Sequence, residues 1–131
     1  MIKVMTHGTF DILHYGHIEY LRKAKSYGEY LIVLLSTDEH CKAHGKKPYY
    51  NYDQRKKFLE AIRYVDLVIE QKGINRNSLI KEYNVNVFVE TEEKRNQSGV
   101  DEKLCQVVYL DRTPEISSTK IKTEVYLPKK G

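Results

Sequence analysis

The chain has 131 residues, of which 40% are hydrophobic and 31% are charged, and its formal net charge is +4 at pH 7. This length suits one domain with its own core, and the composition is ordinary for a soluble globular protein. No apolar run approaches the ~20 residues of a membrane span, and no signal peptide precedes the first strand. We therefore expect one domain over residues 1–127, a disordered tail at 128–131, no membrane partner and a cytoplasmic location.

The net charge limits which partners we expect, and the cysteine spacing limits which disulfide or metal sites we expect. Basic residues are spread along the chain rather than gathered in one patch, so the mild positive excess suits an anionic small molecule. We do not expect nucleic acid as a partner. Cys41 and Cys105 lie far apart with no C-x-x-C spacing, which predicts neither a disulfide framework nor a thiolate metal site.

Strand and helix patterns alternate along the chain. They predict strands at 2–7, 30–35, 67–69, 85–89 and 107–110, and helices at 15–27, 52–63, 75–83 and 117–125. Residues 41–51 have the character of a loop, and the polar run 90–103 that of a loop or a short helix. This alternation predicts an α/β fold, a Rossmann-like, doubly wound parallel sheet of five strands in a single domain.

The turn that follows the first predicted strand is the most informative segment. His14 and His17 flank Gly16 at the start of a predicted helix, and residues three apart share one helix face. The N-terminus of a helix favours anions through its dipole and its unpaired N–H groups. The pattern therefore predicts a polyphosphate site.

Other polar segments converge on the same place. Gly8–Asp11, Ser36–Glu39 and the residues after Leu110 each leave a predicted strand at its carboxyl end. Ligands of open parallel sheets bind in the crevice outside these ends. The sequence thus predicts one crevice lined by all three segments.

The motifs resemble those of a known family. His14 to His17 match an H-x-G-H signature, Arg63-Tyr64-Val65-Asp66 closes a central helix, and residues 112–121 are similar to an R-T-x-G-I-S-T-[ST]-x-I segment. In this order and spacing they resemble the cytidylyltransferase branch of the nucleotidyltransferase superfamily, over about residues 2 to 124. The likeness is greatest to bacterial glycerol-3-phosphate cytidylyltransferases.

This resemblance implies a reaction and its partners. A phosphate oxygen of a small phosphorylated acceptor would attack the α-phosphorus of CTP and release pyrophosphate, giving a CDP-activated precursor for a cell-surface or teichoic-acid-type polymer. The nucleophile is already an anion, so alignment and charge neutralisation matter more than a general base. The resemblance also implies Mg²⁺ and a homodimer.

The residues that match the motifs receive roles by the same resemblance. The catalytic residues are expected to be His14, His17, Lys46 and Arg112. The nucleotide is expected to contact Gly8, Thr9, Phe10, Asp11, Gly16, Arg63, Thr113, Ile116, Ser117, Ser118 and Thr119, with Asp11 also near the metal.

Each role has a simpler alternative. Asp11 could be a turn carboxylate, Lys46 an ordinary loop lysine, and Ser117–Thr119 a helix-capping run. A zinc site that adds His40 and His44 to the paired histidines lacks the usual ligand spacing.

The chain departs from the family on the acceptor side. His44 and Arg76 stand where lysines are usual, and Glu92 and Glu93 remain from an altered M-G-D-D-W segment. These four residues are the expected acceptor contacts. The acceptor stays open among glycerol-3-phosphate, another polyol phosphate and phosphoglutamine; an adenylyltransferase or an inactive nucleotide-binding module are further alternatives.

Overall fold

The structure is a computed structural model that describes residues 1–73 and 75–111. Its strands are β1 (Lys3–Gly8), β2 (Tyr30–Ser36), β3 (Leu67–Gln71), β4 (Val87–Thr91) and β5 (Gln106–Leu110). Its helices are α1 (Tyr15–Lys25), α2 (Asp38–Ala43), α3 (Tyr52–Glu60), α4 (Arg76–Tyr83) and the single 3₁₀ turn η1 (Glu92–Lys94). The helix expected at 117–125 and the tail at 128–131 lie outside the described residues.

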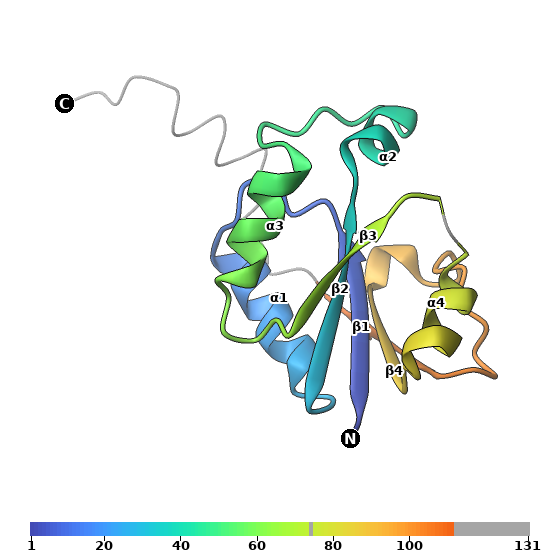
Figure 1. Cartoon of the computed structure of the whole chain (residues 1–131). Coiled ribbons are helices and arrows are strands. Elements are labelled where there is room, and N and C mark those ends of the chain that lie inside the picture. Colours follow the sequence, from blue (N-terminus) through green and yellow to red (C-terminus); the bar gives the residue numbers. More distant parts are fainter. Residues whose placement is uncertain (74, 112–131) are drawn as a thin grey trace.

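The five strands form one parallel sheet in the order β3-β2-β1-β4-β5. Figure 1 shows α1 and α3 on one face of this sheet and α4 on the other. The predicted α/β architecture, doubly wound and Rossmann-like, is therefore confirmed. The strand order reverses between β1 and β4, and this switch point is where ligands of such sheets bind.

Side chains of β1 alternate between the two faces of the sheet, as strand geometry requires. Val4 belongs to the core beneath α1 and α3, together with Leu21 and Leu59. Met5 belongs to the core beneath α4, together with Ile80. Successive residues of β1 therefore point to opposite faces of the sheet and can line different sides of the crevice at its carboxyl edge.

One helix was missed by the sequence analysis. Residues 41–51 were expected to be a loop, yet α2 extends through Ala43. Thr37 begins this helix by accepting a hydrogen bond from the His40 amide at 3.1 Å. Six residues are too few for a 3.6-residue periodicity to stand out, so only the capping residue could have indicated the helix.

Other helix and strand boundaries differ by a few residues from those predicted from the sequence. The first and third helices end at Lys25 and Glu60, and β4 covers 87–91 instead of 85–89. Among the described residues, no helix has the length and apolar character needed to cross a bilayer.

Candidate nucleotide and acceptor site

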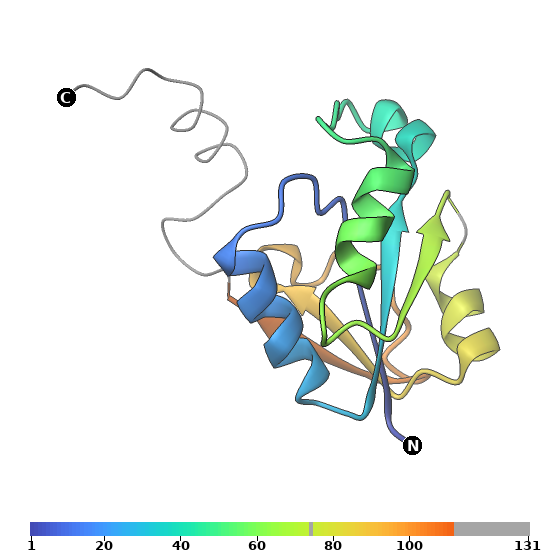
Figure 2. The ribbon, with the colours of Figure 1, turned by 60° about the vertical axis from the view of Figure 1, so that its left-hand side comes forward.

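The carboxyl ends of the strands carry the segments that the sequence predicted to converge. Figure 2 shows the turn after β1, helix α2 and the start of α3 at the same end of the molecule. Helix α4 also begins at this edge, since it follows β3, and η1 follows β4 directly. The predicted convergence of the described segments on one edge is therefore seen in the structure.

A buried arginine that the sequence analysis did not single out joins these segments. The side chain of Arg55, on α3, is fully buried. Its guanidinium donates hydrogen bonds to the carbonyls of Thr9 (3.0 Å), Ser36 (2.8 Å) and Tyr50 (3.0 Å), and to the Asp38 carboxylate (2.8 Å). One side chain thus fastens the turn after β1, the end of β2, α2 and the loop before α3.

Asp11 makes a second tie between the same segments. Its two carboxylate oxygens accept hydrogen bonds from the amides of Tyr49 (2.8 Å) and Tyr50 (3.0 Å), and the residue is buried. This position supports the alternative in which Asp11 fixes a turn. Its contact with a metal stays a prediction.

His14 and His17 cap the helix that they begin. The Nδ1 atom of His14 accepts a hydrogen bond from the Gly16 amide at 3.0 Å, and Nδ1 of His17 accepts one from the His14 amide at 3.3 Å. The two rings lie 3.9 Å apart, centroid to centroid. Because both Nδ1 atoms are acceptors, each neutral ring carries its proton on Nε2.

The protonation of His14 follows from its surroundings. Partial burial lowers the pKa of His14 below its ordinary value, which favours the neutral ring at neutral pH. A neutral imidazole with its proton on Nε2 is a hydrogen-bond donor to a phosphate oxygen. The cap therefore selects the tautomer whose Nε2–H group can donate a hydrogen bond to a phosphate oxygen.

Gly8 and Phe10 give the turn its shape. Phe10 has a backbone φ of 47°, in the left-handed region that bulky residues seldom occupy. A Cβ atom on Gly8 would lie 2.7 Å from the Phe10 ring, so only glycine leaves room for this ring. The ring in turn lies 5.5 Å from that of His17. The strained turn thus positions a predicted catalytic side chain.

A polar network fills the switch point on the α4 face. His7, near the end of β1, binds Glu90 of β4, with 2.7 Å between His7 Nε2 and Glu90 Oε2. Arg76, the first residue of α4, donates to His7 Nδ1 at 3.0 Å and to the Ser98 carbonyl at 2.6 Å. The Thr91 amide also donates to Glu90, at 2.9 Å.

Burial and charge set the ionisation of this network. Burial lowers the pKa of His7, and the nearby Arg76 charge lowers it further, against the opposing effect of Glu90. Burial opposes ionisation of Glu90, but hydrogen bonds from His7 and Thr91 and the charge of Arg76 outweigh it, so its pKa is lowered. We therefore infer that His7 is neutral and that it lies between an ionised Glu90 and a cationic Arg76.

His40, His44 and Lys46 extend the basic character of this side. The rings of His40 and His44 lie 4.2 Å apart, and His44 Nδ1 is 2.9 Å from the His40 carbonyl. Burial lowers the pKa of His40, and His44, Arg76 and Lys46 lower it further. These groups therefore share one electrostatic neighbourhood with Arg76.

Arg63 lies away from the crevice. It is exposed in the turn between α3 and β3, with its guanidinium 5.6 Å from the centre of the Tyr64 ring. That turn leads into the amino end of β3, the opposite edge of a parallel sheet, where Asp66 binds the Leu31 amide at 2.8 Å. The position of Arg63 gives no support to a contact with a nucleotide bound in the same chain.

Two predicted acceptor contacts lie on η1, and several predicted nucleotide contacts lie beyond the described chain. Glu92 is exposed and pairs with Arg95, the Oε1 to Nε distance being 2.6 Å, and Glu93 is exposed beside it. Residues outside the described part include Arg112, Thr113, Ile116, Ser117, Ser118 and Thr119.

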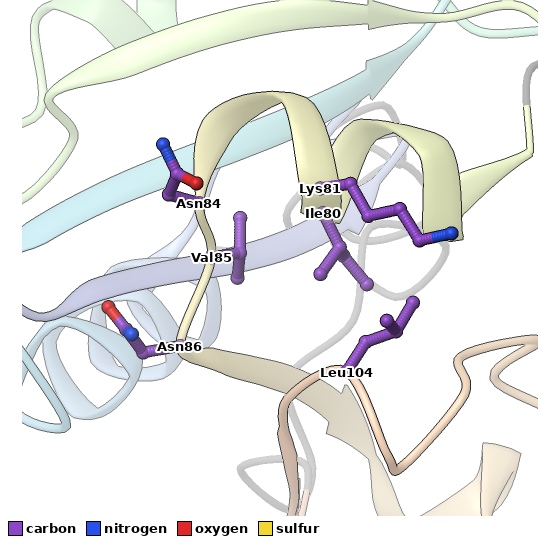
Figure 3. Close-up of a pocket in the computed structure, with 6 residues that line it drawn as sticks. All are labelled: Ile80, Lys81, Asn84, Val85, Asn86 and Leu104. Carbon is purple, nitrogen blue, oxygen red and sulfur yellow. The ribbon is translucent and has the colours of Figure 1, made fainter.

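A surface hollow on the amino side of β4 is a poor alternative site. Its volume is about 230 Å³, and Figure 3 shows the residues that line it: Ile80, Lys81, Asn84, Val85, Asn86 and Leu104. Lys81 is the one charged side chain among them. A triphosphate needs more positive charge than this hollow offers.

The described residues do not form a metal site of their own. Within residues 1–73 and 75–111, no three His, Cys, Asp or Glu side chains gather as metal ligands would. Asp11 offers one carboxylate that two amides already contact. Magnesium stays a prediction.

Comparison with known proteins identifies the family of the chain. The family described as cytidylyltransferase-like matches residues 5–124. The chain is 50% identical to a glycerol-3-phosphate cytidylyltransferase of Staphylococcus aureus over 127 residues, or 96% of each chain. It is 47% identical to one of Bacillus subtilis over 126 residues, which covers 95% of this chain and 98% of the relative.

A solved structure shares the fold. The lipopolysaccharide core biosynthesis protein of Thermoplasma volcanium superposes with a TM-score of 0.73 and 28% identity, over 86% of this chain and 98% of that one. The chain belongs to the cytidylyltransferase-like family.

Proposed function

We propose that this chain transfers CMP from CTP to glycerol-3-phosphate or a similar small phosphorylated acceptor, with release of pyrophosphate. The product would be a CDP-activated precursor for a teichoic-acid-type or other cell-surface polymer. The observation that carries the proposal is the pair of capped imidazoles, His14 and His17, at the carboxyl edge of a sheet that belongs to this family. The two relatives named above, which match nearly the whole chain, support glycerol phosphate as the acceptor.

The reaction requires mainly that the protein align the two substrates and neutralise the charge of their phosphates. An acceptor phosphate oxygen forms a bond to the α-phosphorus of CTP, the bond from that phosphorus to the β-bridging oxygen breaks, and pyrophosphate leaves. Hydrogen bonds from the Nε2–H groups of His14 and His17 would neutralise charge on the phosphates. The ties made by Arg55 and Asp11 hold the surrounding loops before substrate arrives, which lowers the entropic cost of alignment.

Further parts of the proposal concern ions, location and assembly. Mg²⁺ would accompany CTP, because phosphate oxygens supply most of its ligands when it binds with a nucleotide. Lys46 and Arg112 would contact phosphates, and His44, Arg76, Glu92 and Glu93 the acceptor. We also propose a cytoplasmic homodimer.

Pyrophosphate release tests the reaction directly. The purified chain is incubated with Mg²⁺ and each of CTP, ATP, GTP and UTP, against glycerol-3-phosphate, glycerol-2-phosphate, ribitol-5-phosphate, phosphocholine and phosphoglutamine. We expect release with CTP and glycerol-3-phosphate. Release with ATP alone would identify an adenylyltransferase, and CTP binding with no release from any acceptor would favour the inactive module.

A matched pair of variants separates the chemistry of His14 from its structural role. Asparagine is a good N-cap residue, so His14→Asn keeps a side-chain oxygen for the Gly16 amide but removes the imidazole donor. We expect kcat to fall by about 10²–10³-fold, as for loss of one transition-state donor, with little change in stability. His14→Ala should lose activity and stability together. Full activity of His14→Asn would exclude the imidazole from the reaction.

A further inference from the structure

The polar network at the switch point stands out from the strands that carry it. The same face of β1 and β4 is apolar below this level, where Met5 and Phe88 are fully buried in the α4-side core. One step toward the carboxyl edge, the strands carry His7 and Glu90 instead. A buried carboxylate such as Glu90, even when it is paired with Arg76, is seldom more stable than apolar residues of the same size. Stability alone therefore does not explain these two residues.

The hydrogen bonds determine how each group is oriented. A guanidinium has only donors, so His7 Nδ1 must accept from Arg76, and the ring proton must reside on Nε2, facing Glu90. Glu90, whose side chain is 3% exposed, thus fixes the His7 tautomer, and that tautomer offers Arg76 an acceptor. The chain of contacts runs from a buried carboxylate to an arginine.

Arg76 is held on several sides but still reaches the surface. The Ser98 carbonyl takes a hydrogen bond from one terminal nitrogen and His7 Nδ1 takes one from the other. The guanidinium carbon lies 5.6 Å from the centre of the Phe88 ring. The Arg76 side chain nevertheless stays 17% exposed, and the guanidinium has five N–H donors in all.

The surroundings of Arg76 favour an anion. Lys46 and His40 lie in the same electrostatic neighbourhood, and Glu90 is the buried acid that faces Arg76, with 3.6 Å between Oε2 and Nη1. Arg76 and Lys46 thus bring two positive charges to the surroundings of His40, and Glu90 is the acid paired with Arg76. A phosphate group would complete this balance.

This anion site lies across β1 from the paired histidines. His7 points to the α4 face, where its ring stacks on Phe88, whereas its neighbour Thr6 points to the α1 face, where its hydroxyl lies 3.1 Å from that of Tyr20. In phosphoryl transfer the attacking and leaving oxygens lie roughly in line, on opposite sides of phosphorus. A pyrophosphate bound at the helix of His14 thus calls for an attacking phosphate on the far side, where Arg76 lies.

We propose that His7 and Glu90 are positioning residues that hold Arg76 against the phosphate of the acceptor and so help to set acceptor specificity. This rests on the proposed cytidylyltransferase function and assigns two residues that lie outside the motifs. We expect their effect to fall on the acceptor, because His7 binds Arg76 and stacks on Phe88, and Glu90 binds His7 and the Thr91 amide.

Steady-state kinetics with both substrates tests the proposal. His7→Phe keeps a ring against Phe88 but removes both hydrogen bonds, whereas His7→Gln retains a donor and an acceptor. We expect the KM for glycerol-3-phosphate to rise about tenfold in His7→Phe, the effect of one charge-assisted hydrogen bond, and to recover largely in His7→Gln. The KM for CTP should stay within about twofold in both variants.

Ile80→Val is the matched control, because Ile80 is buried in the same α4-side core but lies outside the network. If Ile80→Val raises the acceptor KM as much as His7→Phe, or if His7→Phe raises both KM values equally, the positioning role is refuted. If the wild-type chain shows no turnover with CTP, the proposed function fails separately. Calorimetric binding of glycerol-3-phosphate to the wild type and His7→Phe then decides, and equal affinities would overturn the inference.

Discussion

Replacement of Arg55 by methionine should be among the most damaging single changes in the described chain. Methionine fills much of the same volume but leaves the carbonyls of Thr9, Ser36 and Tyr50 without their donor. An unsatisfied buried polar group costs about 1–3 kcal/mol, and water entering the site would reduce that cost. For three carbonyls we therefore expect the free energy of unfolding to fall by about 4 kcal/mol.

Urea denaturation followed by circular dichroism measures this loss. With an m value of about 2 kcal/mol per molar urea, the unfolding midpoint should fall by about 2 M. Arg55→Lys keeps the charge and up to three donors but loses the planar guanidinium. Its urea midpoint should therefore lie between those of the wild type and Arg55→Met. The KM for CTP should rise in both variants, because the loops around the turn are no longer tied together.

Arg22→Met is the control for the loss of an arginine. Arg22 pairs with Glu19 on the exposed face of α1, with Nε to Oε2 at 2.8 Å, and surface pairs contribute little to stability. Its urea midpoint should not move measurably. An Arg55→Met midpoint as close to wild type as that of Arg22→Met would refute the idea that Arg55 holds the site together.

Three further predictions concern the turn, pH and metal. In Gly8→Ala the new Cβ would displace the Phe10 ring, so we expect a loss of about 1–3 kcal/mol in urea denaturation and a weaker affinity for CTP by calorimetry. Burial, and then the charge of Arg76, lower the pKa of His7 in the folded chain, so near and below about pH 6.5 the unfolded chain binds more protons than the folded chain. The free energy of unfolding should therefore decline as the pH is lowered from about 7.5 to about 5.5, and it should decline less in His7→Gln. EDTA should abolish pyrophosphate release, reversibly with Mg²⁺, without changing the melting temperature of the nucleotide-free protein, because no cluster of metal ligands occurs in the described chain; a drop in that temperature would reveal a resident metal.

The sequence was sufficient for the architecture because its signals are long and regular. The apolar run of β2 and the amphipathic patterns of the longer helices each extend over enough residues for periodicity to be read. The H-x-G-H turn also placed His14 and His17 at a helix start, as the structure has them.

Long-range contacts were beyond the reach of the sequence. Arg55 looked like one more polar residue of an amphipathic helix, and only the folded chain shows that its side chain points inward to three carbonyls. His7 and Glu90 lie 83 residues apart, so their pairing has no local signal beyond a polar residue at the end of an apolar strand. The edge of the sheet that Arg63 occupies was beyond the sequence for the same reason, since its motif carries no information on that edge, and its contact with the nucleotide stays a prediction.

The mutual capping of His14 and His17 has a consequence for how these positions can vary. The Nδ1 atoms cap the start of α1, and the Nε2–H groups are the ones proposed to bind substrate, so folding and catalysis use different atoms of each ring. A library at position 14 sorted only for soluble expression should retain the short capping residues Asn, Asp and Ser beside histidine. The same library sorted for turnover should contract to histidine, and the residues lost between the two sorts would measure what catalysis requires beyond a folded helix.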